Sequence, residues 1–171
     1  ELEERGEIST AERLYREAIH FESNGPKERA VTKLWAALEV TTDESERELI
    51  ADKLVSLLIS SEDLEGVEKV LSRVTDLRSE LRQLLQARLV TERQGENAAL
   101  EFMKEAANEI PGSRLVLSNL TRNLVQNAYR SRSGKQENDE SKAQDYASEA
   151  LEYGNELVEV FPSPESYHLL A

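Results

Sequence analysis

Apolar residues recur at spacings of three and four along almost the whole chain, which is the period of one face of an α-helix. The apolar–polar alternation typical of a half-buried strand does not occur over a useful length. The pattern therefore predicts helices joined by short polar or glycine- and proline-containing breaks. The expected helical segments are residues 9–25, 26–40, 47–61, 64–74, 79–95, 96–112, 113–131 and 140–161.

Several of the expected helix boundaries carry specific signals. Ser9 and Glu12 stand at the spacing of a capping box, and Gly25 is suited to end the same helix. Pro26 suits the first turn of the next helix. The segment 131–140 is polar and contains glycine, so we expect an exposed, mobile loop that offers a second possible contact surface. Near the end of the chain, Pro164 marks the expected start of a further helix.

The helices form four consecutive pairs with a recurring pattern of small and large residues. The second helix of each pair has apolar residues spaced four and then three apart, and a small or branched residue stands twelve positions before three of these sets. The spaced sets are Ala30–Leu34–Ala37, Val67–Leu71–Val74, Ala99–Met103–Ala106 and Ala143–Ala147–Ala150, and the preceding residues are Ala18, Val55 and Ala87.

This pattern resembles the tetratricopeptide repeat (TPR), a helix pair of about 34 residues. The resemblance implies an all-α, right-handed α-solenoid of antiparallel helix pairs, with about four repeats and the start of a fifth. It implies one TPR-like domain over residues 1–171, as a fragment of a longer protein. The repeats would cover residues 11–47, 48–79, 80–113 and 114–163, with a truncated repeat from 164.

The third repeat departs from the family pattern. Gln83 and Gln86 stand where apolar residues are expected, whereas Leu81, Leu84 and Leu85 form a stripe beside them. The departure indicates either a rotated helix or a shifted register.

Charge and composition narrow the classes of partner. The chain has 34 acidic and 21 basic residues, a net charge of −13, and it contains no cysteine. A negative field of this size disfavours nucleic acid and anionic membrane surfaces. No segment approaches the roughly 18 apolar residues of a membrane span. The absence of cysteine excludes disulfides and thiolate sites and fits cytosol and periplasm alike; we favour a cytoplasmic location.

Candidate chemistry is sparse. Glu17–His20 and Glu165–His168 each have the Glu-x-x-His spacing of di-iron helical bundles, but a solenoid would hold the two motifs far apart. Arg13 and His20 are spaced as in some helical ribonucleases, although the acidic balance argues against RNA. We expect no catalytic residue, no cofactor and no metal.

The resemblance also implies a concave binding surface lined by the first helix of each repeat. Arg88 and Arg122 would occupy the same repeat position, and their guanidinium groups could bind a partner carboxylate in a bidentate manner. The alternative is that both arginines belong to a solvent-exposed face without a binding role. The lysine–asparagine clamp of chaperone-binding TPRs is absent, because Tyr15 and Ile19 occupy its first two positions. The expected partner-binding residues are Tyr15, Ile19, Asp52, Ser56, Ile59, Arg88, Ser118, Arg122, Val125 and Gln126; the same register also points to Leu84 and Thr91.

The function that we expect is a protein–protein interaction scaffold that binds a protein or peptide segment in a concave groove. The alternatives are a structural spacer or self-association module within a larger protein and, less favoured, a helical-bundle metalloenzyme. Trp35, the single tryptophan, would cover the seam to the second repeat or act as an exposed contact anchor.

Overall fold

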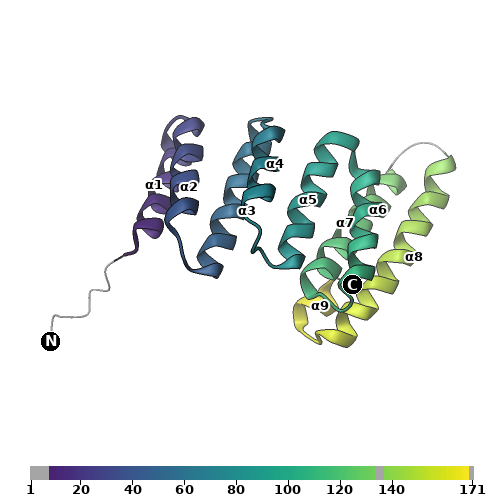
Figure 1. The fold of residues 1–171 in the computed structure, drawn as a ribbon. Coiled ribbons are helices and arrows are strands. Elements are labelled where there is room, and N and C mark those ends of the chain that lie inside the picture. The colour runs from purple at the N-terminus through teal and green to yellow at the C-terminus, as the bar shows by residue number, and fades with distance from the viewer. Residues whose placement is uncertain (1–7, 134–136, 170–171) are drawn as a thin grey trace. The chain divides into compact units, whose positions relative to one another are not determined.

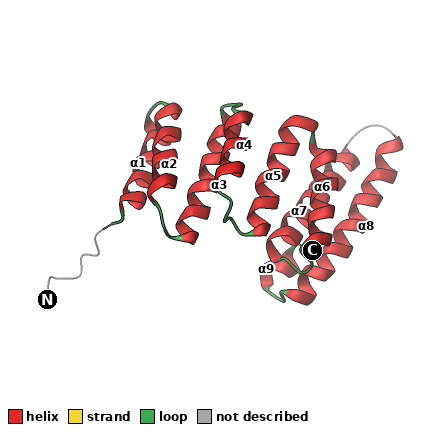
Figure 2. Ribbon diagram, viewed as in Figure 1, coloured by secondary structure: helices red, strands yellow, loops and turns green. Residues whose placement is uncertain are grey.

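The computed structural model of the protein describes residues 8–133 and 137–169. These residues contain helices and loops and no strand (Figure 2), so the prediction of an all-α fold is confirmed. The helices within the described ranges are α1 (Thr10–Asn24), α2 (Lys27–Val40), α3 (Glu44–Ser60), α4 (Leu64–Arg73), α5 (Ser79–Gln94), α6 (Glu96–Glu109), α7 (Arg114–Ser133), α8 (Glu137–Val160) and α9 (Pro164–His168) (Figure 1).

The helices pack in sequence-adjacent pairs, as the sequence predicts. The pairs are α1–α2, α3–α4, α5–α6 and α7–α8, and α9 packs against α8. The chain divides into two compact units, Glu1–Arg78 and Ser79–Ala171. This division coincides with the expected start of the third repeat near Glu80. Each unit therefore contains two complete helix pairs, and the second unit also contains α9.

Side-chain caps fix where several of the helices begin. The Ser9 hydroxyl accepts a hydrogen bond from the backbone N–H of Glu12 at 2.9 Å, which confirms the predicted first cap. The carboxylates of Asp43 and Asp63 accept equivalent bonds at the starts of α3 and α4. Each cap satisfies a backbone donor that has no partner within its own helix. Pro26 differs slightly from expectation, because it precedes the first helical residue of α2 instead of lying in its first turn.

The expected loop over residues 131–140 is wrong at both ends. Helix α7 continues to Ser133 and α8 already begins at Glu137, while residues 134–136 lie outside the described residues. Several of the polar residues on either side are good helix formers, so these residues are as compatible with a helical turn as with a loop. Helix α3 likewise begins at Glu44, three residues before its expected start, because Asp43 caps it.

Small residues lie where paired helices approach closely. Ala18 and Ala30 are 1% and 0% exposed in the first pair, and a small side chain at such a position permits close packing of two helices. The predicted apolar positions on the second helices are also buried, with one exception. Ala147 is exposed, because the buried face of α8 runs through Ala143, Ala150 and Leu157.

The core of the second unit is formed by α5, α6, α7 and α8. Helices α6 and α7 each contribute four residues to it, and those of α7 are branched aliphatic side chains that are completely buried. Tyr146, Tyr153 and Phe161 pack against the edge of this core from α8 and the residue that follows it. Burial raises the pKa of the Tyr153 phenol. The fully buried residues of the core on α7 are Val116, Leu117, Leu120 and Leu124.

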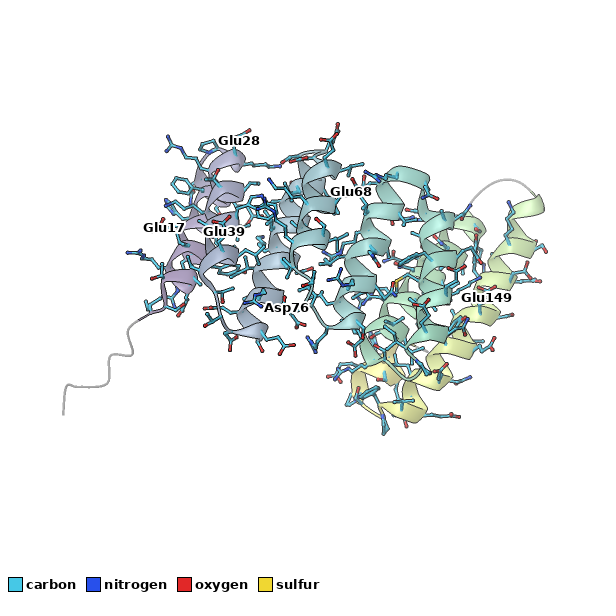
Figure 3. The ribbon with its side chains drawn as sticks, viewed as in Figure 1. Glu17, Glu28, Glu39, Glu68, Asp76 and Glu149 are labelled. Carbon is cyan, nitrogen blue, oxygen red and sulfur yellow. The ribbon has the colours of Figure 1, made fainter. Side chains whose placement is uncertain are left out.

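Ion pairs join neighbouring helices at the edges of each unit. In the first unit, Lys33 contacts Glu17 at 2.5 Å between α2 and α1. In the second, the Lys104 ammonium lies 2.7 Å from Glu149 of α8, which Figure 3 labels, and 3.0 Å from Glu101. Burial alone would lower the pKa of Lys104, but the two carboxylates outweigh it and raise that pKa. These pairs fix α6 to α8 and α1 to α2.

Thr121 on α7 gives a first testable prediction. Its side chain is completely buried, and its hydroxyl makes no hydrogen bond with any described residue. A buried polar group without a partner costs free energy of desolvation. Thr121→Val keeps the shape and removes the hydroxyl, so we expect the free energy of unfolding to rise by about 1 kcal/mol. Thermal and urea unfolding measure the change; an unchanged or lower stability would contradict the burial of an unpaired hydroxyl.

Candidate functional site

The second unit has an open hollow of about 680 Å³ that is lined by residues of α7, α8 and α9. Helix α9 lies beside the C-terminal end of α8 (Figure 1), and Pro164 and the Ser163 cap define its start. Arginine side chains from α7 lie on one side and the short helix on the other. The lining residues are Arg114, Ser118, Arg122, Leu157, Pro164, Glu165, Ser166, His168 and Leu169.

The two arginines of the hollow differ in what they contact. The Arg114 guanidinium lies over the Phe161 ring, 6.0 Å from its centre, in a cation–π arrangement that holds it in place. Arg122 is exposed and forms no ion pair with any described residue. The Ser118 hydroxyl donates to the backbone carbonyl of Arg114 and so supports its own helix. Arg122 is therefore the cation of this hollow that remains available to a ligand.

Apolar and polar groups share the rest of the hollow. Leu157 is almost completely buried at its base, and Leu169 is half-buried. A hydrogen bond from its own backbone amide lowers the pKa of Glu165, as do the Ser163 hydroxyl and the nearby Arg114. Glu165 is thus ionised at neutral pH beside Arg114. The hollow combines an apolar base, one engaged arginine and one unengaged arginine.

The other predicted residues of α7 do not join Arg122 in this hollow. Val125 is 43% exposed on the helix surface. Gln126 lines a different hollow, together with Thr91 of α5 and Arg130. The structure therefore divides the predicted α7 residues between two places, with Ser118 and Arg122 at the α9 end.

The predicted residues of α5 also divide. Arg88 lies on the exposed side of the helix. The Thr91 hydroxyl donates to the Ala87 carbonyl at 3.0 Å. Leu84 is only 9% exposed and belongs to the core, so its expected place on the groove surface is wrong. Leu84 and Leu85, two of the three leucines of the stripe, are both buried.

In the first unit, the predicted residues lie on two helices that contact each other, α1 and α3. The side chains of Lys53 and Glu22 join these helices at 2.6 Å. The Ser56 hydroxyl donates to the Asp52 carbonyl of its own helix at 2.9 Å. Four predicted residues there are half-buried and Ser56 is exposed; the half-buried ones are Tyr15, Ile19, Asp52 and Ile59.

Trp35 contacts the following helix pair, as its predicted seam role requires. Its half-buried indole lies 5.3 Å from the Lys69 ammonium and 5.6 Å from the Arg73 guanidinium, both on α4. Two cations over one indole stabilise the contact between α2 and α4. Arg73 also approaches Glu39 at 4.0 Å. The sequence did not indicate these cation–π contacts, because their residues lie more than thirty positions apart.

The two Glu-x-x-His motifs lie in different units, and both histidines are exposed. Glu17 is paired with Lys33. Among the described residues, no three side chains of the histidine, cysteine, aspartate or glutamate type gather as metal ligands would. Figure 3 labels Glu17 of α1, Glu39 of α2 and Asp76 of the loop after α4. Across residues 8–133 and 137–169, no helix has the length and apolar character needed to cross a membrane.

The sequence pattern did not predict the part that α9 and Arg114 play in the hollow. The signal was present in α7, where Arg114, Ser118 and Arg122 are spaced by four and so share one helix face. That this face and α9 line one hollow depends on the turn through Phe161, which local periodicity does not predict.

Comparison of the chain with protein-family models gives no match, and comparison with curated proteins gives none either.

Proposed function

We propose that this chain is a TPR-like helical-repeat scaffold that binds a segment of a partner protein. The four sequence-adjacent helix pairs support the proposal. The small buried residues Ala18, Ala30 and Ala87 support it as well, because they stand at the positions where the repeat pattern requires close helix packing. In a right-handed solenoid of such pairs, the first helices present a preformed surface to a partner.

The binding site that we propose is the hollow between α7, α8 and α9. A partner carboxylate would form a two-pronged, charge-assisted pair with the Arg122 guanidinium, whose planar shape matches a carboxylate. Apolar partner atoms would cover the half-buried Leu169, which lines the hollow. The observation that carries this proposal is Arg122, an exposed arginine beside an apolar hollow with no ion-pair partner among the described residues.

A charge reversal tests the site. We expect Arg122→Glu to weaken capture of the partner by about tenfold or more, because it replaces a charge-assisted pair with repulsion. The full chain is used as bait in lysate at low and high salt, and captured proteins are identified and titrated against purified bait. Lys142→Glu, an exposed charge reversal on α8 of the same unit, is the matched control.

The possible results separate the proposed functions. A partner bound by the wild type and by Lys142→Glu, and lost by Arg122→Glu, supports binding in the hollow. A partner retained equally by all three baits contradicts the role of Arg122. Recovery of the bait alone would overturn the scaffold proposal and favour the structural spacer or self-association module.

A further inference from the structure

Helix α7 has a charge opposite to that of the chain as a whole. Its twenty residues include four arginines and no acidic residue, whereas the chain carries a net charge of −13. Its pair helix α8 has eight acidic residues and a single lysine. Positive charge is therefore concentrated on one helix of a strongly acidic protein, where it can orient a partner of negative charge.

The protein itself engages only two of these four arginines in contacts that involve described residues. Arg114 lies over Phe161, and Arg130 pairs with Glu96 at 2.5 Å. Arg122 and Arg132 are exposed, and neither forms an ion pair with a described residue. Within the described part of the chain, these two arginines are thus exposed cations of α7 without an ion-pair partner.

These two arginines belong to a continuous stripe along α7. Ser118, Arg122, Val125, Tyr129 and Arg132 follow one another at intervals of four, three, four and three residues, the spacing that lines one side of a helix. Val125 is 43% exposed and Tyr129 is 77% exposed. We call this set of five residues the α7 stripe; it places two exposed apolar side chains between two arginines.

We infer that the α7 stripe binds an acidic amphipathic helix of a partner protein. Resting on the proposed scaffold function, this inference names the partner's chemistry: two acidic residues that flank two apolar residues, on one helix face. The intervals between Arg122, Val125, Tyr129 and Arg132 are three, four and three. A partner helix with the same intervals places its acids on the arginines and its apolar residues on Val125 and Tyr129.

Geometry favours a helix over an extended segment as this occupant. Arg122 and Arg132 are ten residues apart, or about 15 Å along the helix axis. A second helix laid alongside repeats its side chains at the same rise, so that all four contacts stay in register. An extended chain repeats its side chains on one face about every 7 Å, so it places only three side chains along these 15 Å and cannot meet all four contacts.

The test uses a synthetic amphipathic helical peptide whose Glu, Leu, Leu and Glu stand at intervals of three, four and three. Its binding to the full chain is measured by fluorescence anisotropy at low and high salt. Two comparison peptides have the same length: one carries Lys in place of both Glu, and one carries a central Pro that prevents helix formation. We expect the acidic helical peptide to bind at least about tenfold more tightly than either, and less tightly at high salt.

Variants of the stripe locate the binding. We expect Arg132→Gln and Tyr129→Ser each to weaken binding of the acidic peptide about five- to tenfold, because each removes one of its contacts. Arg130→Gln is the matched control on the same helix, since Arg130 is paired with Glu96 outside the stripe; it should leave binding within about twofold.

Three results would overturn the inference. They are no binding of the acidic helical peptide, equal binding of the proline peptide, and displacement of the acidic peptide by a single-stranded oligonucleotide that binds the chain equally tightly. The failure of this inference can be told from failure of the scaffold proposal. A natural partner lost with Arg122→Glu but retained with Tyr129→Ser and Arg132→Gln would contradict the stripe and leave the hollow as the site.

Discussion

Replacing Leu120 with alanine should lower the free energy of unfolding of the second unit by about 3 kcal/mol. Leu120 is completely buried in the core of α5–α8, between Leu117 and Leu124 on the inner face of α7. The substitution removes buried apolar atoms and leaves a cavity in a closely packed region, and both changes destabilise the folded state. Urea unfolding followed by circular dichroism measures the loss.

Leu115→Ala is the control for this prediction. Leu115 lies on the same helix, but 37% of its surface is exposed, so the same change of side chain should cost less than about 1 kcal/mol. Equal losses for Leu115→Ala and Leu120→Ala would show that the inward face of α7 has been misplaced. That result would also remove the basis for placing Arg122 and the α7 stripe on its outer surface.

Glu48→Gln should lower the free energy of unfolding of the first unit by about 2 kcal/mol. The Glu48 side chain is 9% exposed, and its two oxygens accept hydrogen bonds at 2.7 and 2.8 Å from Nε of Arg78. The backbone N–H of Arg78 adds a bond at 3.0 Å. The amide of glutamine carries no charge and presents an NH₂ group to the guanidinium, so the buried side chain loses its charge-assisted hydrogen bonds to the exposed Arg78.

The pH dependence provides a second measurement on Glu48. The hydrogen bond from the Arg78 side chain lowers the pKa of Glu48 below its ordinary value of 4.5, against the opposing effect of burial. A lowered folded-state pKa contributes stability that is fully present above the unfolded-state value and is lost as the pH falls through the folded-state pKa. We therefore expect the wild type to lose more stability than Glu48→Gln as the pH falls below about 4.5.

Glu44→Gln is the control, because Glu44 lies exposed in the first turn of the same helix. Its substitution should cost only about 0.5 kcal/mol through the helix dipole. If Glu48→Gln and Glu44→Gln proved equally stable at neutral pH, with parallel acid transitions, the stabilising role of the Glu48–Arg78 pair would be contradicted.

Much of the fold followed from local sequence. Apolar spacing predicted the helices, and the capping residue Ser9 placed the start of the first one, because a cap is a contact within four residues. The buried alanines Ala18 and Ala30 followed from the repeat pattern. These features depend on neighbours in the chain, and the sequence shows those neighbours directly.

The features that could not be predicted depend on distant residues. The buried carboxylate of Glu48 accepts hydrogen bonds from Arg78, which is thirty positions away in the sequence. Leu84 was expected on the groove surface, but it packs in the core of the second unit. Ala147 fits the repeat spacing, yet the longer α8 buries a different face. Local periodicity identifies an apolar face; the packing of neighbouring helices decides how that face is rotated.

The candidate site was predictable in part. Arg122 and Ser118 were identified from the repeat register, and the structure places both in one hollow. The contributions of Leu157 and α9 depended on the turn after α8, which has no repeat signature. Arg88 and Gln126 were predicted by the same register but lie elsewhere in the second unit.

Hydrogen exchange of the chain with and without its captured partner tests the central claim most directly. If the partner binds through the hollow and α7, amides near the hollow in α7 and α9 should become more protected, while those of α2 and α4 in the first unit should exchange unchanged. Protection confined to α2 and α4, with α7 and α9 unaffected, would contradict binding at Arg122 and move the functional surface to the first unit.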